Sequence, residues 1–209
     1  MCQEVLRMVQ QMDLEDVETQ LALQCAPLIT GIKISNLLMI DSEKEEALRV
    51  ILKKTGIYSF RLATTKGKTA FLLFRRQPLE SYLADRGVRD FLEELGYEDP
   101  SLGMILRSFQ ARYRAFVSHE RKEGSTFPHE LGILLGYPLE DVRGFMVHGG
   151  RDYLASGYWK VYEDAPRKLA IFKAYEDAKE SVIQLLSNDI NIRLILEIYS
   201  DTEIKKIAG

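Results

Sequence analysis

Apolar residues recur at helical spacing over residues 4–24, and the acidic stretch 13–16 interrupts them. This pattern predicts an N-terminal helical segment with a break and a restart. An apolar, small-residue run at 25–33 follows, and the short apolar run 36–40 predicts a buried strand. The chain is therefore expected to lead from helix into sheet.

A capping box and a β-hairpin are the clearest local signals that come next. Ser42 precedes Glu45 by three positions, so their side chains can accept backbone N–H groups at the start of a helix. That helix is predicted to end near Lys54. The stretches 57–64 and 69–75 alternate apolar and polar residues around a short turn, which predicts a hairpin.

Helical periodicity dominates the middle of the chain. A helix is predicted over 78–95 with a break near Gly87, and Asp99 is predicted to cap a helix that continues to Phe116. The polar stretch 118–125 is the best candidate for a mobile loop.

The last part of the chain predicts one more strand among helices. Two short helices are expected at 128–135 and 138–147, followed by an alternating strand at 157–162 and a long helix over 164–186. Residues 190–207 fit either a strand or a helix.

The order of these elements indicates an α+β fold. It matches a ferredoxin-like, split βαβ plan, with a small, mainly antiparallel sheet of about four strands, a large helical insertion and C-terminal helices. The 209 residues suit a single domain. We expect an N-terminal helical extension at 1–24, a core at 25–175 and a C-terminal helical region at 176–209.

Composition limits the partners and the compartment. The net charge is −3, which argues against a nucleic-acid partner, because such binding needs a basic face. The two cysteines, Cys2 and Cys25, are too few for a disulfide framework and indicate a reducing compartment. Neither a secretion signal nor an apolar run of membrane-spanning length is present, so we expect a cytoplasmic protein without membrane contact.

His129 and Glu130 are the strongest catalytic candidates. A metalloprotease helix needs a second histidine at position 133, where this chain has Ile133, so no metal site is expected. Histidine titrates near neutral pH, so His129 can serve as a general base with Glu130 orienting it. Alternatively, both residues lie in the first turn of a helix, where a carboxylate favours the helix dipole.

The two short helices have the spacing of a DNA-binding helix-turn-helix. Gly132, Gly136 and Val142 occupy the positions of its two small residues and one apolar residue. The second helix of such a motif faces DNA with its first residues, which here include Glu140 and Asp141 and would repel phosphates. A plain hairpin of two helices is therefore favoured over a regulator.

Two further segments could form a small site. The stretch 148–152 places two glycines beside an arginine, which can cradle an anion or end a helix. On the predicted strand, Tyr158, Lys160 and Tyr162 share one face and Trp159 takes the other. That face suits either a pocket or a half-exposed sheet surface.

Three groups of residues carry a family resemblance. They are Cys25-Ala26-Pro27-Leu28 with Gly31-Ile32-Lys33 and Asn36-Leu37, Phe127-Pro128-His129-Glu130-Leu131-Gly132 with Leu135-Gly136-Tyr137-Pro138 and Asp141-Val142, and Gly157-Tyr158-Trp159-Lys160-Val161-Tyr162. From Cys25 to Tyr175 the chain resembles an uncharacterised bacterial family, common in anaerobes and classed as a domain of unknown function. The resemblance implies no activity. It also implies cysteines near the last motif in relatives, where this chain has Ala155 and Tyr158.

We expect a non-catalytic cytosolic protein that binds a protein partner or a small anionic ligand, because no complete catalytic set is present. Its cationic side chains would hold the anionic group, and a tyrosine would stack or hydrogen-bond. The candidate site residues are Lys33, Asn36, Arg76, His129, Glu130, Arg143, Tyr158 and Lys160. No cofactor is evident, and a homodimer would follow from an exposed apolar face on the C-terminal helices. The alternatives are a small-molecule enzyme that uses His129 and Glu130, and a helix-turn-helix regulator.

Overall fold

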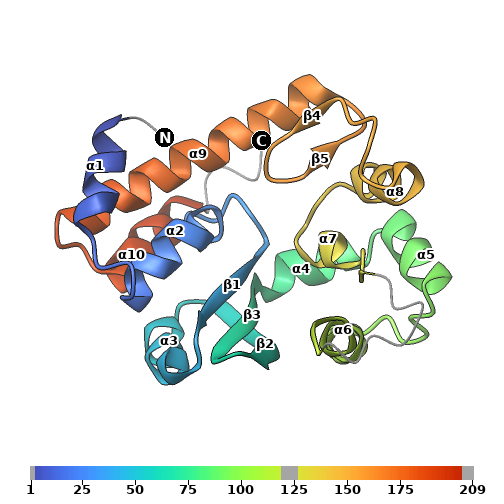
Figure 1. The fold of residues 1–209 in the computed structure, drawn as a ribbon, viewed down its shortest axis with the longest axis horizontal. Coiled ribbons are helices and arrows are strands. Elements are labelled where there is room, and N and C mark those ends of the chain that lie inside the picture. The colour runs from blue at the N-terminus through green and yellow to red at the C-terminus, as the bar shows by residue number, and fades with distance from the viewer. Residues whose placement is uncertain (1–2, 119–126, 204–209) are drawn as a thin grey trace.

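The computed structural model describes residues 3–118 and 127–203, and its fold is α+β (Figure 1). The predicted loop 118–125 lies outside the described residues, apart from Ser118. The elements, in chain order, are α1 (Gln3–Gln11), α2 (Val17–Ile29), β1 (Ser35–Asp41), the 3-10 helix η1 (Ser42–Lys44), α3 (Glu45–Leu52), β2 (Ile57–Thr65), β3 (Lys68–Arg75), α4 (Arg76–Leu83), α5 (Arg86–Glu94), α6 (Leu102–Val117), α7 (Leu131–Leu134), α8 (Leu139–His148), β4 (Ala155–Ser156), β5 (Lys160–Val161), α9 (Ala165–Ser187) and α10 (Ile192–Glu203).

A three-stranded antiparallel sheet lies between two groups of helices, with β3 in the middle and β1 and β2 at the edges (Figure 1). Ser35 of β1 lies opposite Phe74, and Ile57 of β2 lies opposite Arg75. Because η1 and α3 join the two edge strands, the three strands have the order of a split βαβ unit. The predicted hairpin of β2 and β3 is confirmed.

The predicted strand at 157–162 is confirmed only over β5, Lys160–Val161. β4 and β5 form a separate two-stranded hairpin instead, and neither joins the larger sheet. Gly157 lies in the turn of this hairpin, so close to α9 that a Cβ would collide with the ring of Phe172. Because the turn packs directly on α9, the segment cannot run straight as one strand. A ferredoxin-like sheet of four strands is therefore not confirmed.

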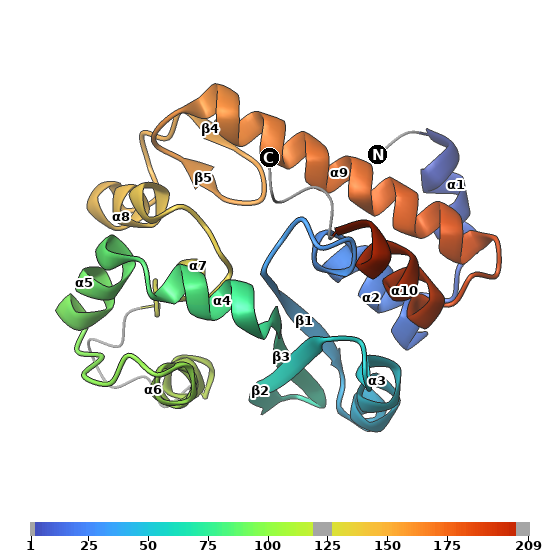
Figure 2. The same cartoon turned by 180° about the vertical axis from the view of Figure 1, so that it is seen from behind.

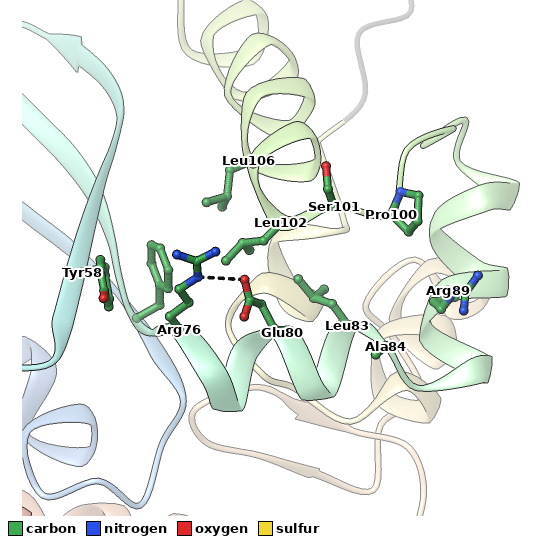
Figure 3. Close-up of a pocket in the computed structure, with 12 residues that line it drawn as sticks. Tyr58, Arg76, Glu80, Leu83, Ala84, Arg89, Pro100, Ser101, Leu102 and Leu106 are labelled. Atoms are coloured by element: carbon green, nitrogen blue, oxygen red, sulfur yellow. Dashed lines mark hydrogen bonds and ion pairs between the residues drawn. The ribbon is translucent and has the colours of Figure 1, made fainter.

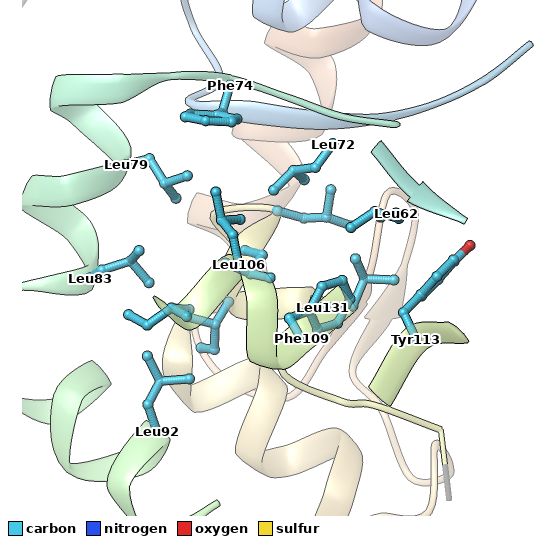
Figure 4. Packing of buried hydrophobic residues seen from close by; sticks show 14 of the residues in the cluster. Leu62, Leu72, Phe74, Leu79, Leu83, Leu92, Leu106, Phe109, Tyr113 and Leu131 are labelled. Atoms are coloured by element: carbon cyan, nitrogen blue, oxygen red, sulfur yellow. The ribbon is translucent and has the colours of Figure 1, made fainter. Parts of the chain in front are cut away.

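The sheet buries both of its faces. Leu62, Leu72 and Phe74 point into one cluster, which we call the first core, together with apolar residues of α4 to α8 (Figure 4). Phe71 and Leu73 point into a second core with residues of α2, α3, α9 and α10. Successive side chains of a strand point to opposite faces, so β3 supplies both cores in turn.

Segments from both ends of the chain complete the second core. Leu21 of α2 packs in the same cluster as Ile192 and Ile195 of α10. The 23-residue helix α9 runs from the β4–β5 hairpin to α1 and α2 (Figure 2). The ambiguous tail is helical from Ile192 to Glu203. Described residues of both terminal regions, among them Leu21 and Ile195, contribute to the packing around the sheet.

The predicted capping box is also wrong. The Ser42 hydroxyl lies 3.0 Å from the Thr69 hydroxyl, and Thr69 in turn donates to Glu45. Neither η1 nor α3 receives a side-chain cap. The two polar side chains are therefore used to join α3 to the sheet rather than to start the helix.

Two helix boundaries differ from the sequence predictions. α2 continues through Pro27 to Ile29, although proline removes one helix hydrogen bond. The last residues of α2 are buried in the second core, and this packing outweighs the local preference. The break predicted near Gly87 falls at Asp85, whose carboxylate caps α5 by accepting the N–H groups of Gly87 and Val88.

Side chains from neighbouring helices occupy both edges of the sheet. The Gln24 amide on α2 accepts the Met39 N–H at 3.0 Å and donates to the Met39 carbonyl at 3.1 Å, as a strand would. At the other edge, Arg114 of α6 donates to the Leu62 carbonyl at 2.9 Å. These contacts satisfy backbone groups that an edge strand otherwise exposes.

Candidate functional site

A cavity of about 420 Å³ lies between the α7–α8 pair and the β4–β5 hairpin. We call it the aromatic cavity, because four of its wall residues carry phenyl, phenol or indole rings. Natural small-molecule sites span about 300–1,000 Å³, so its size suits a small ligand. The wall consists of Phe127, His129, Leu131, Gly132, Leu135, Tyr137, Asp141, Val142, Phe145, Ser156, Gly157, Trp159 and Lys160.

Ring contacts hold the aromatic side chains of this wall. Tyr137 stacks on Trp159 with ring centroids 4.9 Å apart. The His129 ring lies near both Phe127 and Phe145, at centroid distances of 5.6 and 5.5 Å. Because neighbouring rings restrict one another, the aromatic side chains of the wall are held in place.

Asp141 joins α8 to the β4–β5 hairpin and to α9. Its carboxylate is buried on α8 and accepts the indole N–H of Trp159 at 2.7 Å and the backbone N–H of Tyr162 at 2.8 Å. The ammonium group of Lys168 on α9, which is also buried, lies 3.4 Å from the same carboxylate and pairs with Glu140. The Asp141 carboxylate is therefore already engaged in hydrogen bonds and an ion pair within the protein.

Lys160 and Ser156 stand opposite each other on the hairpin and both line the cavity. The Lys160 ammonium donates to the carbonyl of Gly150, just past the glycine that ends α8, and lies 4.7 Å from the centre of the Tyr153 ring. In the described chain, no carboxylate lies within ion-pair distance of this ammonium group. The stretch 148–152 therefore ends a helix and supplies a carbonyl to a cation.

The helix pair is held close by a glycine. A Cβ on Gly132 would come within 2.8 Å of Val142 Cγ2, so α7 and α8 meet at the contact that the helix-turn-helix spacing predicts. α7 has only four residues. Of the two acids at the start of α8, Glu140 pairs with Lys168 and Asp141 is buried. These side chains bind α9, and the start of α8 is not a basic surface for DNA.

Glu130 points away from His129. Its buried carboxylate accepts the phenol O–H of Tyr97 at 2.9 Å and an N–H of Arg112 at 3.2 Å. Burial and the neighbouring Glu130 carboxylate raise the pKa of Tyr97 well above its usual value. The structure thus places the two halves of the proposed acid–base pair in different surroundings, with only His129 at the aromatic cavity.

The buried Lys33 and the partly buried Asn36 form a pair next to the cavity, outside its wall. The Lys33 ammonium donates to Asn36 Oδ1 at 2.9 Å and lies 5.3 Å from the centre of the Tyr137 ring. Burial lowers the pKa of Lys33 to about 8. Burial also raises the pKa of the nearby Cys25 thiol to about 12, so this thiol is a poor nucleophile.

Arg76 lines a second, more polar cavity of about 660 Å³ between β2, α4 and the start of α6 (Figure 3). Its guanidinium group pairs with Glu80 at 2.9 Å, and Tyr58 of β2 and Leu106 of α6 also line the cavity. Both members of this ion pair are largely exposed, so water screens it. Arg76 is therefore separate from Lys160 and His129.

The last two candidates make contacts of their own on the surface. Arg143 on α8 pairs with Glu94 at 2.9 Å and covers the Phe91 ring at 4.9 Å. Tyr158, in the hairpin turn, donates to Glu176 of α9 at 2.9 Å. Of the eight candidate residues, the structure brings only His129 and Lys160 together in one cavity.

Residues 3–118 and 127–203 contain no group of three or more His, Cys, Asp or Glu side chains arranged to hold a metal ion. Within the same ranges, no helix combines the length and the apolar character needed to cross a bilayer. Cys25 is a free, buried thiol.

Sequence reasoning missed several residues of the site. Phe127 and Phe145 flank His129, and Asp141 anchors the hairpin through Trp159. Phe127 and Asp141 lie within the residue groups that carry the family resemblance, and this grouping was the available signal. No local signal marks Lys168, whose partners lie on α8.

The fold and the cavity define a small α+β protein in which a helix pair and a hairpin enclose an aromatic pocket. Residues 21–196 match the model of a family described as "Protein of unknown function (DUF3793)", and the chain belongs to this family. The match covers the sheet, the first core, the whole aromatic cavity and every buried residue of the second core except Val17. No curated protein and no solved structure matches the chain.

Proposed function

We propose that this protein binds a small, flat, largely apolar molecule in the aromatic cavity. The observation that carries the proposal is the cavity of about 420 Å³ with Tyr137, Trp159 and Phe145 in its wall. Protein sites for small ligands combine such apolar walls with a few polar groups, and here His129, Ser156 and Lys160 are those groups.

The contacts around the cavity favour binding over catalysis. Glu130 is engaged by Tyr97 and Arg112, so it is not placed to orient His129. Asp141 is likewise engaged by Trp159 and Lys168, so it lacks the freedom of a general acid or base. A single histidine beside an apolar wall supports recognition better than it supports a reaction.

The neutral two-ring probe 2-naphthylmethanol tests this proposal by calorimetry. We expect saturable binding at one site per chain, together with a change in the emission of Trp159, the only tryptophan in the protein. Ser156→Phe adds a ring at the cavity wall and should abolish both signals. Ser59→Phe, at an exposed position of β2, is the matched control and should leave both unchanged.

Two results would contradict the proposal. One is the absence of saturable binding to the wild-type protein at probe concentrations up to the solubility limit. The other is equal binding to the wild-type protein and to a folded Ser156→Phe variant, which would place the probe elsewhere on the surface.

A further inference from the structure

We propose that the ligand of the aromatic cavity is an anion, a planar aromatic carboxylate whose charged group binds Lys160. This inference rests on the proposed function, because it names the class of ligand for the same cavity. The aromatic wall alone would accept any flat apolar molecule, whereas Lys160 would also select for negative charge.

The charges at the cavity wall favour an anion. Asp141 is the one carboxylate among the wall residues, and the Lys168 ammonium and the Trp159 indole N–H already compensate it. The ammonium group of Lys160, in contrast, has only the Gly150 carbonyl as a hydrogen-bond acceptor among the described residues. The wall therefore carries an uncompensated positive charge.

The surroundings of Lys160 strengthen its attraction for a carboxylate. Its ammonium group lies 5.8 Å from the centre of the Phe145 ring and 4.7 Å from that of Tyr153, and the side chain is half-buried. Fewer water molecules can therefore solvate the charge, and a Coulomb interaction there is stronger than at an open surface. A carboxylate is also a better acceptor than a carbonyl, since charge-assisted hydrogen bonds are roughly twice as strong.

Ser156 provides a further donor beside Lys160, and His129 lies elsewhere in the same wall. Ser156 pairs with Lys160 across the hairpin, so the two side chains extend from the same face of the two strands. Its hydroxyl makes no hydrogen bond to another described residue, and neither does the His129 imidazole. The phenyl rings beside His129 would meanwhile contact the flat body of the ligand.

The test compares 2-naphthoate with 2-naphthylmethanol, which share one ring system and differ in charge. We expect the carboxylate to bind the wild-type protein about tenfold more tightly, as a hydrogen bond between charged groups predicts. Lys160→Met should weaken 2-naphthoate binding by about the same tenfold and so remove the preference between the two probes. Lys160→Arg keeps the charge and should keep most of the preference. Lys173→Met, at an exposed lysine of α9 that pairs with Asp177, is the matched control.

The outcomes separate the two proposals. Equal affinity of the two probes for the wild-type protein would overturn the anion and leave the cavity as a binding site. A preference for 2-naphthoate that persists in Lys160→Met would also overturn it, because the charge would then come from another residue. Failure of both probes to bind would overturn the proposed function itself. The wild-type comparison needs no variant to fold, so the anion is tested in every case.

Discussion

Replacing Asp141 by asparagine should destabilise the whole junction between α8, α9 and the hairpin. The carboxylate accepts the indole N–H of Trp159 at 2.7 Å and the backbone N–H of Tyr162 at 2.8 Å, and it faces the buried Lys168. An asparagine of the same shape keeps one acceptor oxygen. Its NH₂ group would then face an N–H donor, so at least one of the two hydrogen bonds is lost.

The magnitude follows from these contacts. A hydrogen bond to a charged group contributes about 1.5–3 kcal/mol, so its loss at Asp141 accounts for about 2 kcal/mol. Lys168 keeps Glu140 as a partner, and this limits the additional cost of a weakened buried ion pair to about 1 kcal/mol. We therefore expect Asp141→Asn to lower the free energy of unfolding by about 3 kcal/mol.

Urea unfolding of both proteins, followed by Trp159 emission and by far-UV circular dichroism, measures this difference. Glu140→Gln removes the half-exposed partner of Lys168 and should cost less than about 1 kcal/mol, which makes it the matched control. A loss of less than about 0.5 kcal/mol in Asp141→Asn would refute the reasoning, since surface substitutions lie within that range. Equal losses in the two variants would show that charge alone, and not the hydrogen bonds, matters.

Two further predictions concern packing and pH. Gly132→Ala should destabilise the protein by about 1–3 kcal/mol, because the new Cβ would meet Val142. Gly103→Ala, in open space on α6, should stabilise it by about 0.5–1 kcal/mol. Thermal unfolding of both variants measures these changes. A stabilising Gly132→Ala would contradict the close approach of α7 and α8. Burial lowers the pKa of Lys33 from 10.5 to about 8, so between these values the unfolded state binds more protons and stability rises with pH. Below pH 8, burying protonated Lys33 thus lowers the free energy of unfolding by about 3 kcal/mol. Between pH 7 and pH 10 the stability of the wild-type protein should rise by most of this amount relative to that of Lys33→Met. Parallel stability curves of the two proteins would exclude this effect.

Local patterns in the sequence predicted most helices and the β2–β3 hairpin, because their periodicity is set by neighbouring residues. The prediction of one strand over 157–162 was confirmed only for Lys160–Val161, because the geometry of this segment depends on distant partners. Trp159 donates to Asp141 on α8, and Gly157 packs on Phe172 of α9. Neither contact can be predicted from the alternation of apolar and polar residues.

The candidate site was predicted only in part, because it also depends on contacts between residues that are distant in the sequence. His129 and Glu130 are neighbours in sequence, but successive side chains at the start of a helix do not face each other. One therefore reaches the aromatic cavity while the other pairs with Arg112 beside the first core. Lys160 was predicted as a ligand-binding residue and does line the cavity, and its binding role stays a prediction.

The side chains at the two edges of the sheet bear on how the protein behaves at high concentration. Exposed strand edges are templates on which other chains can add strands, which leads to aggregation. Here the Gln24 amide already occupies the donor and acceptor of Met39, and Arg114 occupies the carbonyl of Leu62. Deamidation of Gln24 would replace its donor by a carboxylate facing the Met39 carbonyl. A slow chemical change at one glutamine would thus leave one backbone acceptor of the edge strand without its side-chain donor.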